Sequence, residues 1–258
     1  MFGIAATQPR QRSGPTHDSF GQNPSCDADV GLKTFPAEDR LTLAGTRCIM
    51  TEDLILINEQ NRAVGRAEKH AVHAAGLLHR AFSIFLVDAQ GQLLLQRRSR
   101  SKYHSAGLWA NSCCGHPRPG ESTLRAARRR LGEELGASTS LRFGFQARYR
   151  TALPNGLIEN ELVYVDFGMT PEHLSPNPDE VSGVGRMSLA ALRADIARRP
   201  QRYTYWLRYY LKNHYDAIRR GLDDVRRSDR KPNRSTRLVL AVMGSSTQSP
   251  DKPPREEN

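Results

Sequence analysis

The sequence lacks both a long apolar run and an export signal. Near the C-terminus, the longest uncharged apolar run covers only residues 238–243, far short of the ~20 residues that a membrane-spanning helix needs. The first residues, MFGIAATQPRQRSGP, have no charged start followed by an apolar stretch. We therefore expect no membrane contact, and these missing signals are the only basis for expecting a cytoplasmic protein.

Cysteine is also scarce. The chain has four cysteines, at positions 26, 48, 113 and 114. Their uneven spacing is not that of a disulfide framework, and the adjacent pair is not a CxxC knuckle. Without an export signal, we expect reduced thiols.

Acidic residues are in deficit: 27 Asp and Glu stand against 38 Lys and Arg, a net charge of +11. Residues 1–50 carry five basic and five acidic side chains, and residues 213–258 carry ten and seven, which leaves about +8 on the middle segment. A basic segment suits nucleic acid or a small polyanionic substrate, and most of these arginines can simply form a solvated face. Charge alone does not decide between these alternatives.

Composition divides the chain into three parts. Residues 1–49 are rich in Gly, Pro, Ser, Thr, Gln and Asp without sustained periodicity, and we predict that they are largely disordered and dispensable. Met50 directly precedes the first strand-like run, DLILINE, so the folded domain is predicted to span residues 50–222. Residues 223–258 end in a polar, proline-containing stretch and are predicted to form a disordered tail.

Strands and helices are mixed in the middle segment. The runs 81–88 and 92–98 are split by DAQG, and the runs 143–152 and 157–168 flank LPNG, so each pair predicts a hairpin. Helical spacing predicts helices at 122–135, 188–199 and 205–220. Interleaved strands with few helices predict a single α+β domain.

The helix at 122–135 carries a metal-binding pattern with one substitution. The spacing of Gly115, Glu121, Arg129, Glu133, Glu134 and Gly136 resembles the Nudix box, but Arg130 stands where that box has a glutamate and Ala137 is small for its apolar position. Because Arg130 and Glu134 are four residues apart, they share one helix face. The exchange replaces a carboxylate ligand with a forked cation suited to phosphate oxygens. An amphipathic helix with an ordinary salt bridge explains this helix alone equally well.

Histidines and a carboxylate pair suggest a divalent ion. His73, His79 and His116 lie near apolar runs, and Glu159 and Glu161 are two residues apart on a predicted strand, so both point to one face. Three imidazoles and two carboxylates, one of them bidentate, can fill six positions around an ion. A ligand set of nitrogen and oxygen atoms suits a Mn²⁺, Mg²⁺ or Zn²⁺ ion of this kind. It does not suit a closed structural zinc site, which would rely on thiolates.

Taken together, these motifs resemble the type I isopentenyl-diphosphate isomerases, which interconvert isopentenyl and dimethylallyl diphosphate. The supporting stretches follow the family's order over residues 51–212: GLLHRAFSIFL, LLLQRRSRSKYHSAGLWANSCCGHP, the degenerate box, RYRTALPNGLIENE and YTYWLRYYL. The resemblance implies a Nudix-like mixed β-sheet sandwiched by helices. It also implies a monomer that acts on a small diphosphate and binds no nucleic acid.

The resemblance also implies roles for individual residues. The catalytic positions would be Cys114, Glu161 and Tyr149. The substrate-binding positions would be Lys69, Arg98, Lys102 and Arg130 for the diphosphate and Trp206 for the hydrocarbon. The ligands of a Mn²⁺, Mg²⁺ or Zn²⁺ ion would be His73, His79, His116, Glu159 and Glu161, with His70 a competitor for the first position, and Glu134 would hold a second Mg²⁺ on the diphosphate.

These residue types suit the movement of a double bond. One proton must be added at the terminal methylene and one removed from C2, which requires an acid and a base. Glu161, beside Tyr149, can donate on one face and Cys114, as a thiolate, can accept on the other. Which group acts first depends on the direction of reaction, and the sequence leaves their protonation states open. Trp206 offers a π face to the intermediate cation, worth ~2 kcal/mol when desolvated.

Alternative roles remain open at this level. Cys114 can instead be a covalent nucleophile, although no His/Asp relay is visible beside it in the sequence. Cys113 is expected to be a small buried residue. The competing functions are a Nudix hydrolase of a nucleoside or prenyl diphosphate, which would release phosphate, and a basic metal-binding module for nucleic acid, for which no ordered aromatic–basic platform is visible.

Overall fold

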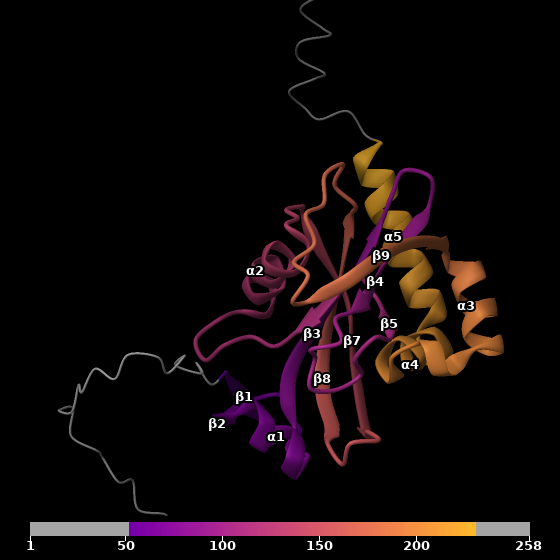
Figure 1. Cartoon of the computed structure of the whole chain (residues 1–258). Coiled ribbons are helices and arrows are strands. Elements are labelled where there is room, and N and C mark those ends of the chain that lie inside the picture. The colour runs from indigo at the N-terminus through magenta and orange to yellow at the C-terminus, as the bar shows by residue number, and fades with distance from the viewer. Residues whose placement is uncertain (1–51, 231–258) are drawn as a thin grey trace, which may run out of the picture. The chain divides into compact units, whose positions relative to one another are not determined.

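A mixed β-sheet forms the centre of residues 52–230, the range that the structure, a computed structural model, describes (Figure 1). Within this range the strands are β1 (Asp53–Ile57), β2 (Ala63–Glu68), β3 (His79–Val87), β4 (Gln92–Arg98), β5 (Trp109–Ala110), β6 (Cys113–Gly115), β7 (Leu141–Ala152), β8 (Ile158–Met169) and β9 (Val181–Ser188). The helices are α1 (Lys69–Ala75), α2 (Thr123–Leu135), α3 (Leu189–Arg198), α4 (Tyr205–Asn213) and α5 (Tyr215–Asp229), with a 3₁₀ turn at Pro200–Arg202.

Strand β3 connects most of the sheet. Along its whole length, from His79 opposite Glu161 to Val87 opposite Met169, one edge pairs in parallel with β8. Its other edge pairs in turn with β1, β6 and β4. Beyond these neighbours, β7 pairs with β8, β9 and β5 pair with β4, and β2 pairs with β1. Segments far apart in the sequence, such as β6 and β8, therefore lie on the two sides of one strand.

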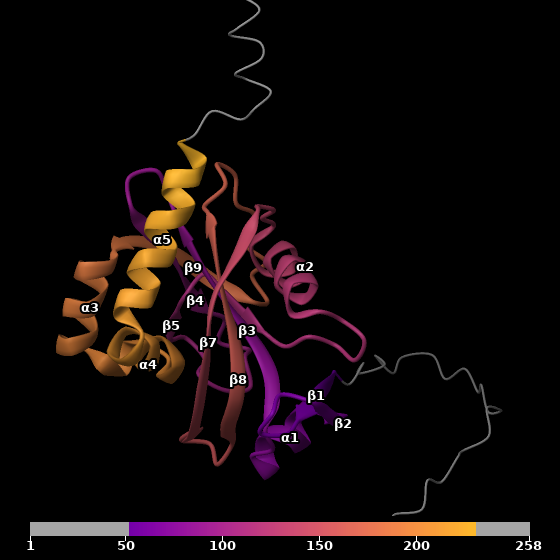
Figure 2. The ribbon, with the colours of Figure 1, turned by 180° about the vertical axis from the view of Figure 1, so that it is seen from behind.

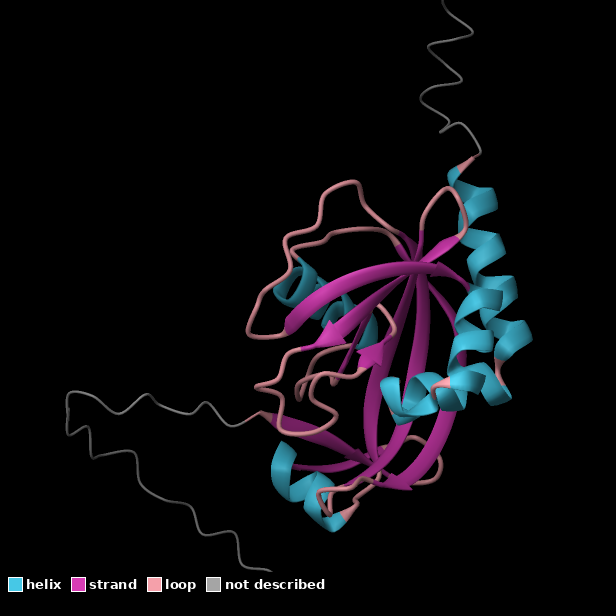
Figure 3. Ribbon diagram, turned by 45° about the vertical axis from the view of Figure 1, so that its right-hand side comes forward, coloured by secondary structure: helices cyan, strands magenta, loops and turns pink. Residues whose placement is uncertain are grey.

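The two faces of the sheet pack against different helices. On β3, Ala81, Phe85 and Val87 belong to the hydrophobic cluster that also contains residues of α3, α4 and α5. The alternate residues Phe82 and Ile84 belong to the cluster that contains α2, because successive side chains of a strand point to opposite faces. Figures 2 and 3 show α2 on one side of the sheet and α3–α5 on the other. The predicted α+β sandwich is confirmed.

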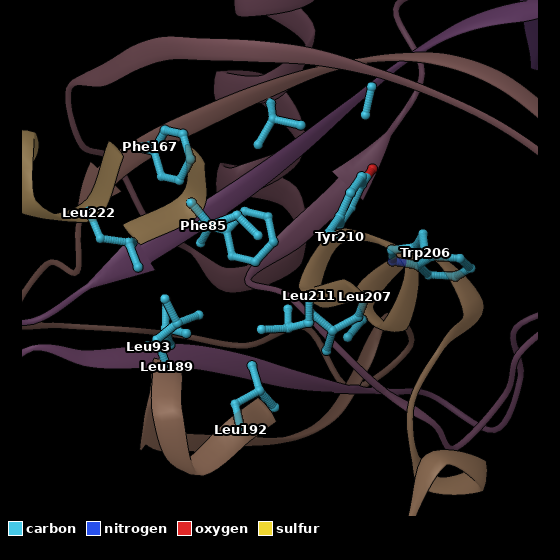
Figure 4. Packing of buried hydrophobic residues seen from close by; sticks show 14 of the residues in the cluster. Phe85, Leu93, Phe167, Leu189, Leu192, Trp206, Leu207, Tyr210, Leu211 and Leu222 are labelled. Carbon is cyan, nitrogen blue, oxygen red and sulfur yellow. The ribbon is translucent and has the colours of Figure 1, made fainter. Parts of the chain in front are cut away.

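The larger cluster fixes α4 and α5 against the sheet. Phe85 stacks on Phe167, with ring centroids 6.0 Å apart, and meets Tyr210 edge-on at 5.8 Å. Figure 4 shows these rings together with Leu207, Leu222 and other buried residues of the helices. Full burial of a side chain of this size contributes roughly 1.5–3 kcal/mol. The cluster therefore determines where the residues of α4 lie relative to β3.

Both predicted hairpins form. The ends of β3 and β4 pair at Leu86–Leu94 and Val87–Leu93, and β7 and β8 pair over their full lengths. At the second turn, Gly156 adopts φ +81°, a left-handed conformation that glycine accepts without strain. The short elements β2, β5, β6 and α1, and also β9, were not among the predicted ones.

The C-terminal helical region differs from the prediction in two respects. The single helix predicted over 205–220 is interrupted at His214, which has φ −131° and ψ 22°, so α4 and α5 are separate. The predicted tail begins at residue 223, but α5 continues to Asp229 because Leu222 and Val225 extend its buried face. The rest of the predicted tail, residues 1–49 and the predicted start near Met50 lie outside the described residues. None of the helices between residues 52 and 230 is long and apolar enough to cross a membrane.

Asp166 on β8 lowers the stability of the fold at neutral pH. Its side chain is buried and its Oδ2 has no hydrogen-bond partner. Burial raises the pKa of this carboxyl from 3.8 to about 6, against the opposing charge of Arg128. Between these two values the folded protein holds a proton that the unfolded chain has released. The free energy of unfolding therefore falls as pH rises through this window and stays low above it.

We expect Asp166→Asn to raise the melting temperature at pH 7–8 and to lose this advantage near pH 4. A gain of about 1 kcal/mol in the free energy of unfolding raises the melting temperature by roughly 2–4 °C in a domain of this size. Calorimetry across this pH range measures the effect, with the exposed Asp179→Asn as control. A difference between Asp166→Asn and the parent that does not change with pH would contradict this assignment.

Candidate active site

A pocket opens beside the first half of β3 and collects side chains from most of the elements. Its lining includes these predicted site residues: Lys69, Arg98, Lys102, Cys114, His116, Arg130, Glu134, Tyr149, Glu159, Glu161 and Trp206. The other two, His73 and His79, are fully buried and contact its carboxylates. The structure thus brings all the predicted site residues into one region.

Three histidines and a carboxylate form a compact group. His73, His79, His116 and Glu161 each place one ligand atom within 4.8 Å of the others. These residues come from α1, the start of β3, the position directly after β6, and β8. By contrast, His70 is exposed and lies outside this group. The group therefore contains His73 as the first histidine.

Hydrogen bonds on the far side of two rings fix their tautomers. Nδ1 of His73 lies 2.7 Å from the carbonyl oxygen of Lys69, and Nδ1 of His79 lies 2.8 Å from that of Leu77. Because a carbonyl only accepts, each Nδ1 carries the proton and each Nε2 keeps a lone pair. Both Nε2 atoms are buried without a hydrogen-bond partner. This is the arrangement that orients a histidine toward a metal ion.

Glu159 and Glu161 lie side by side on the same face of β8, as predicted. The Oε2 of Glu159 is 3.6 Å from Nε2 of His73. The Oε1 of Glu161 is 2.8 Å from Nε2 of His116, and its Oε2 accepts a 2.5 Å hydrogen bond from the Tyr149 hydroxyl. Two buried carboxylates with three imidazoles around them can hold a divalent cation.

The two carboxyls differ in their affinity for a proton. Burial opposes ionisation of Glu161, but the hydrogen bond with His116 Nε2 and the positive charge that His116 and His79 can carry outweigh it and hold the pKa of Glu161 well below its usual range. For Glu159, burial and the neighbouring charge of Glu161 raise the pKa. Glu161 therefore loses its proton readily, whereas ionisation of Glu159 as well is favoured when a cation is bound beside the pair.

Cys114 is held on the opposite side of β3 from Glu161. It lies opposite Ser83 in the β3–β6 pairing, and its thiol donates to Oδ1 of Asn111 at 3.1 Å. The amide of Asn111 has only one orientation available, because its Nδ2 donates to the carbonyls of Ile84 and Cys113 at 2.9 and 3.1 Å. Burial raises the pKa of Cys114 to about 12, so the group is a thiol in this structure.

The two adjacent cysteines have different environments. Both are free, and Cys113 is fully buried in the cluster that contains α2. Cys114 faces the pocket, where Ser83 Oγ lies 3.3 Å from its sulfur and 2.9 Å from the Tyr210 hydroxyl. The expectation that Cys113 is a small buried residue is confirmed.

Each of three predicted diphosphate-binding cations contacts a carboxylate. Lys69 Nζ lies 2.9 Å from Glu52, Lys102 contacts Glu180, and Arg130 lies 2.5 Å from Glu134. Burial lowers the pKa of Lys102 to about 8, and the nearby Arg98 and Arg130 act in the same direction. The cations therefore form one closely spaced set whose charge is locally balanced.

Aromatic groups close the remaining wall. The guanidinium of Arg98 lies over the Trp206 ring, 5.2 Å from its centroid, and His104 meets the same ring edge-on at 6.0 Å. His104 also places Nε2 3.4 Å from Glu159, and burial with the charge of Arg98 lowers its pKa to about 2. Trp206 thus belongs both to the core and to the pocket.

Several residues of the site are not identified by the sequence reasoning: Glu52, Ser83, Gln96, His104, Asn111 and Glu180. Asn111 and His104 stand in the same resemblance-carrying stretch as Cys114, so that stretch gave a usable signal that they belong to the site. Gln96, which donates to Glu134 at 3.0 Å, also stands in this stretch, whereas Glu180 has no local signal because its partners are distant in sequence.

Comparison with known proteins gives consistent results. The family model for the NUDIX domain matches residues 77–207. Isopentenyl-diphosphate Delta-isomerase 1 of Aromatoleum aromaticum is 49% identical over 158 residues, which is 61% of this chain and 89% of the relative. The isopentenyl-diphosphate Delta-isomerase of Serratia proteamaculans is 46% identical over 164 residues, or 64% and 92%. The similarity therefore extends over most of each relative.

Proposed function

The chain belongs to the NUDIX-domain isopentenyl-diphosphate Delta-isomerases, and we propose that the pocket beside β3 is where it interconverts isopentenyl and dimethylallyl diphosphate. The observation that supports this site is the placement of Cys114 and Glu161 on the two strands that flank β3. An alkene between them meets one ionisable group on each side. The reaction needs such a pair, because one carbon gains a proton and another loses one.

The two groups hold opposite protonation states before and after turnover, and both are deprotonated while the tertiary cation exists. When one donates its proton to the terminal methylene, the other accepts a proton from C2, and in the reverse direction they exchange roles. Asn111 sets the direction of the Cys114 S–H bond, and Tyr149 holds Oε2 of Glu161. These contacts hold both groups in fixed positions, which lowers the entropic cost of proton transfer.

The His/Glu group fits a divalent cation. We propose His73, His79, His116, Glu159 and Glu161 as its ligands, with Mn²⁺, Mg²⁺ or Zn²⁺ as the ion. The support is the pair of buried, unpartnered Nε2 atoms that point toward the carboxylates. When bound, such an ion balances the charge of the carboxylate pair. Glu134, buried on α2, is proposed to hold a Mg²⁺ that arrives with the diphosphate.

The diphosphate is proposed to anchor a substrate whose reacting end has no polar group. Lys69, Arg98, Lys102 and Arg130 supply the donors for its oxygens. Trp206 lies at the hydrocarbon end, where its ring excludes water and offers a π face to the tertiary cation. Binding energy from the anionic end thereby positions the reacting carbons.

Incubation with isopentenyl diphosphate in heavy water tests this function directly. With Mg²⁺ and then Mn²⁺ present, NMR is expected to show deuterium-labelled dimethylallyl diphosphate, and a parallel assay is expected to show no phosphate or pyrophosphate release. Phosphate release without isomerisation would instead identify a hydrolase. A product without deuterium would contradict proton transfer from exchangeable groups.

A further inference from the structure

Glu180 makes an unusual contact within the set of phosphate-binding cations. This residue directly precedes β9, and its backbone is fixed by hydrogen bonds to Ser99 and Asn177 at 2.9 and 3.0 Å. Its Oε1 lies 3.1 Å from Arg130 Nη2, and its Oε2 contacts Lys102 Nζ. One carboxylate thus bridges two of the four cations proposed to bind the diphosphate.

This bridge has the chemistry of a bound phosphate group. Two anionic oxygens about as far apart as those of a phosphate accept from an ammonium and a guanidinium. The three side chains are largely shielded from solvent, with exposed fractions of 18% for Lys102 and Arg130 and 22% for Glu180. Partial burial makes these contacts stronger than those of an exposed ion pair. A ligand oxygen that takes the same donors must compete with the carboxylate.

We propose that Glu180 is an internal anion that occupies the phosphate donors of the pocket and is displaced when a diphosphate enters. This inference rests on the proposed function, because it takes Lys102 and Arg130 as diphosphate-binding residues. Displacement imposes the same cost on every ligand. A diphosphate offsets that cost through its additional oxygens and charge, whereas a monophosphate offsets less of it. Because this cost is common to both ligands, it leaves the ratio of their affinities unchanged and lowers both. Glu180 therefore sets the affinity that an anion must reach to occupy these donors.

Glu180→Gln tests the proposal, because glutamine has the same size but no charge. Calorimetric titration with inorganic pyrophosphate and with orthophosphate, both with Mg²⁺, measures binding independently of turnover. We expect pyrophosphate to bind about three- to tenfold more tightly to the variant and orthophosphate to gain by a similar factor. In the assay, the KM for isopentenyl diphosphate is expected to fall, with no increase in kcat.

Two further variants separate the specific effect from a general one. Glu59→Gln removes one negative charge from an ion pair with Arg148 that lies outside the pocket, and its pyrophosphate affinity is expected to match the parent. Glu180→Asp keeps the charge and is expected to lack the gain. Melting temperatures and circular dichroism establish that each variant is folded.

The outcomes are distinct. Weaker pyrophosphate binding by folded Glu180→Gln would overturn the proposal and make Glu180 a residue that orients the two cations for the substrate. An equal gain in Glu59→Gln would also overturn it, since net charge alone would then explain the effect. Failure of the proposed function would appear separately, as absence of isomerisation by the parent protein, whatever the pyrophosphate titrations show.

Discussion

Cys114→Ala is expected to lower kcat by about 10³-fold or more, with the KM for isopentenyl diphosphate changed by no more than a few fold. General acid–base groups typically contribute 10²–10⁴-fold, and Cys114 is the ionisable side chain of β6 that lines the pocket. The KM should hold because the diphosphate cations lie on other elements. Steady-state isomerisation, followed by NMR of the allylic product, measures both constants.

The adjacent cysteine provides a matched control. Cys113→Ala also removes a sulfur atom, but the sulfur of Cys113 is buried against α2 and not in the pocket. We expect Cys113→Ala to retain kcat and to lose some stability because it leaves a small cavity. Cys114→Ser, which keeps a hydroxyl at the same place, should recover part of the lost rate. Near-normal turnover by Cys114→Ala would remove this residue from the mechanism.

Features of the site that depend on local periodicity could be predicted from the sequence. Helix α2 begins after Ser122, whose hydroxyl accepts from the Arg125 amide, and ends at Gly136 with φ +59°. Serine is favoured at the N-cap and glycine at the C-cap, so the bounds of the helix could be predicted from the sequence. Likewise, Glu159 and Glu161 share a face because side chains on a strand alternate. Neither feature requires knowledge of distant partners.

Strand register could not be predicted in the same way. Asn155 and Gly156 indicate a tight turn, but the turn contains three residues between Leu153 and Leu157. This length places Tyr149 directly opposite Glu161. A two-residue turn would shift the pairing by one residue and move the hydroxyl away from the carboxylate. The hydrogen bond between Tyr149 and Glu161 thus depends on a turn length that the sequence of the turn leaves open.

The charge balance of the pocket was also beyond the sequence. The excess of about +8 on the middle segment was compatible with nucleic acid, a small polyanionic substrate or a solvated basic face. The structure pairs Lys69, Lys102 and Arg130 with carboxylates from elsewhere in the fold. For Glu180, the partners Lys102 and Arg130 are 78 and 50 residues away. Such contacts arise from loop positions in the folded chain, so residue spacing does not reveal them.

His79→Gln is expected to weaken Mn²⁺ binding by about 100-fold or more and to reduce kcat accordingly. His79 is fully buried, and its Nε2 faces the carboxylates while its Nδ1 is committed to the Leu77 carbonyl. Replacing even an outer partner of a ligand typically costs 10–100-fold in metal affinity, and loss of a ligand should cost at least as much. Calorimetric titration of the chelator-treated protein with Mn²⁺ gives the affinity.

Metal-linked stability provides a second readout that does not depend on catalysis. At a free Mn²⁺ concentration 100 times the parent's Kd, binding stabilises the parent by about 2.7 kcal/mol, whereas a 100-fold weaker variant gains only about 0.4 kcal/mol. His70→Gln, on the exposed side of α1, should behave like the parent in both measurements. A His79→Gln variant that loses activity but keeps the full Mn²⁺-dependent rise in melting temperature would show that His79 acts on the substrate and not on the metal.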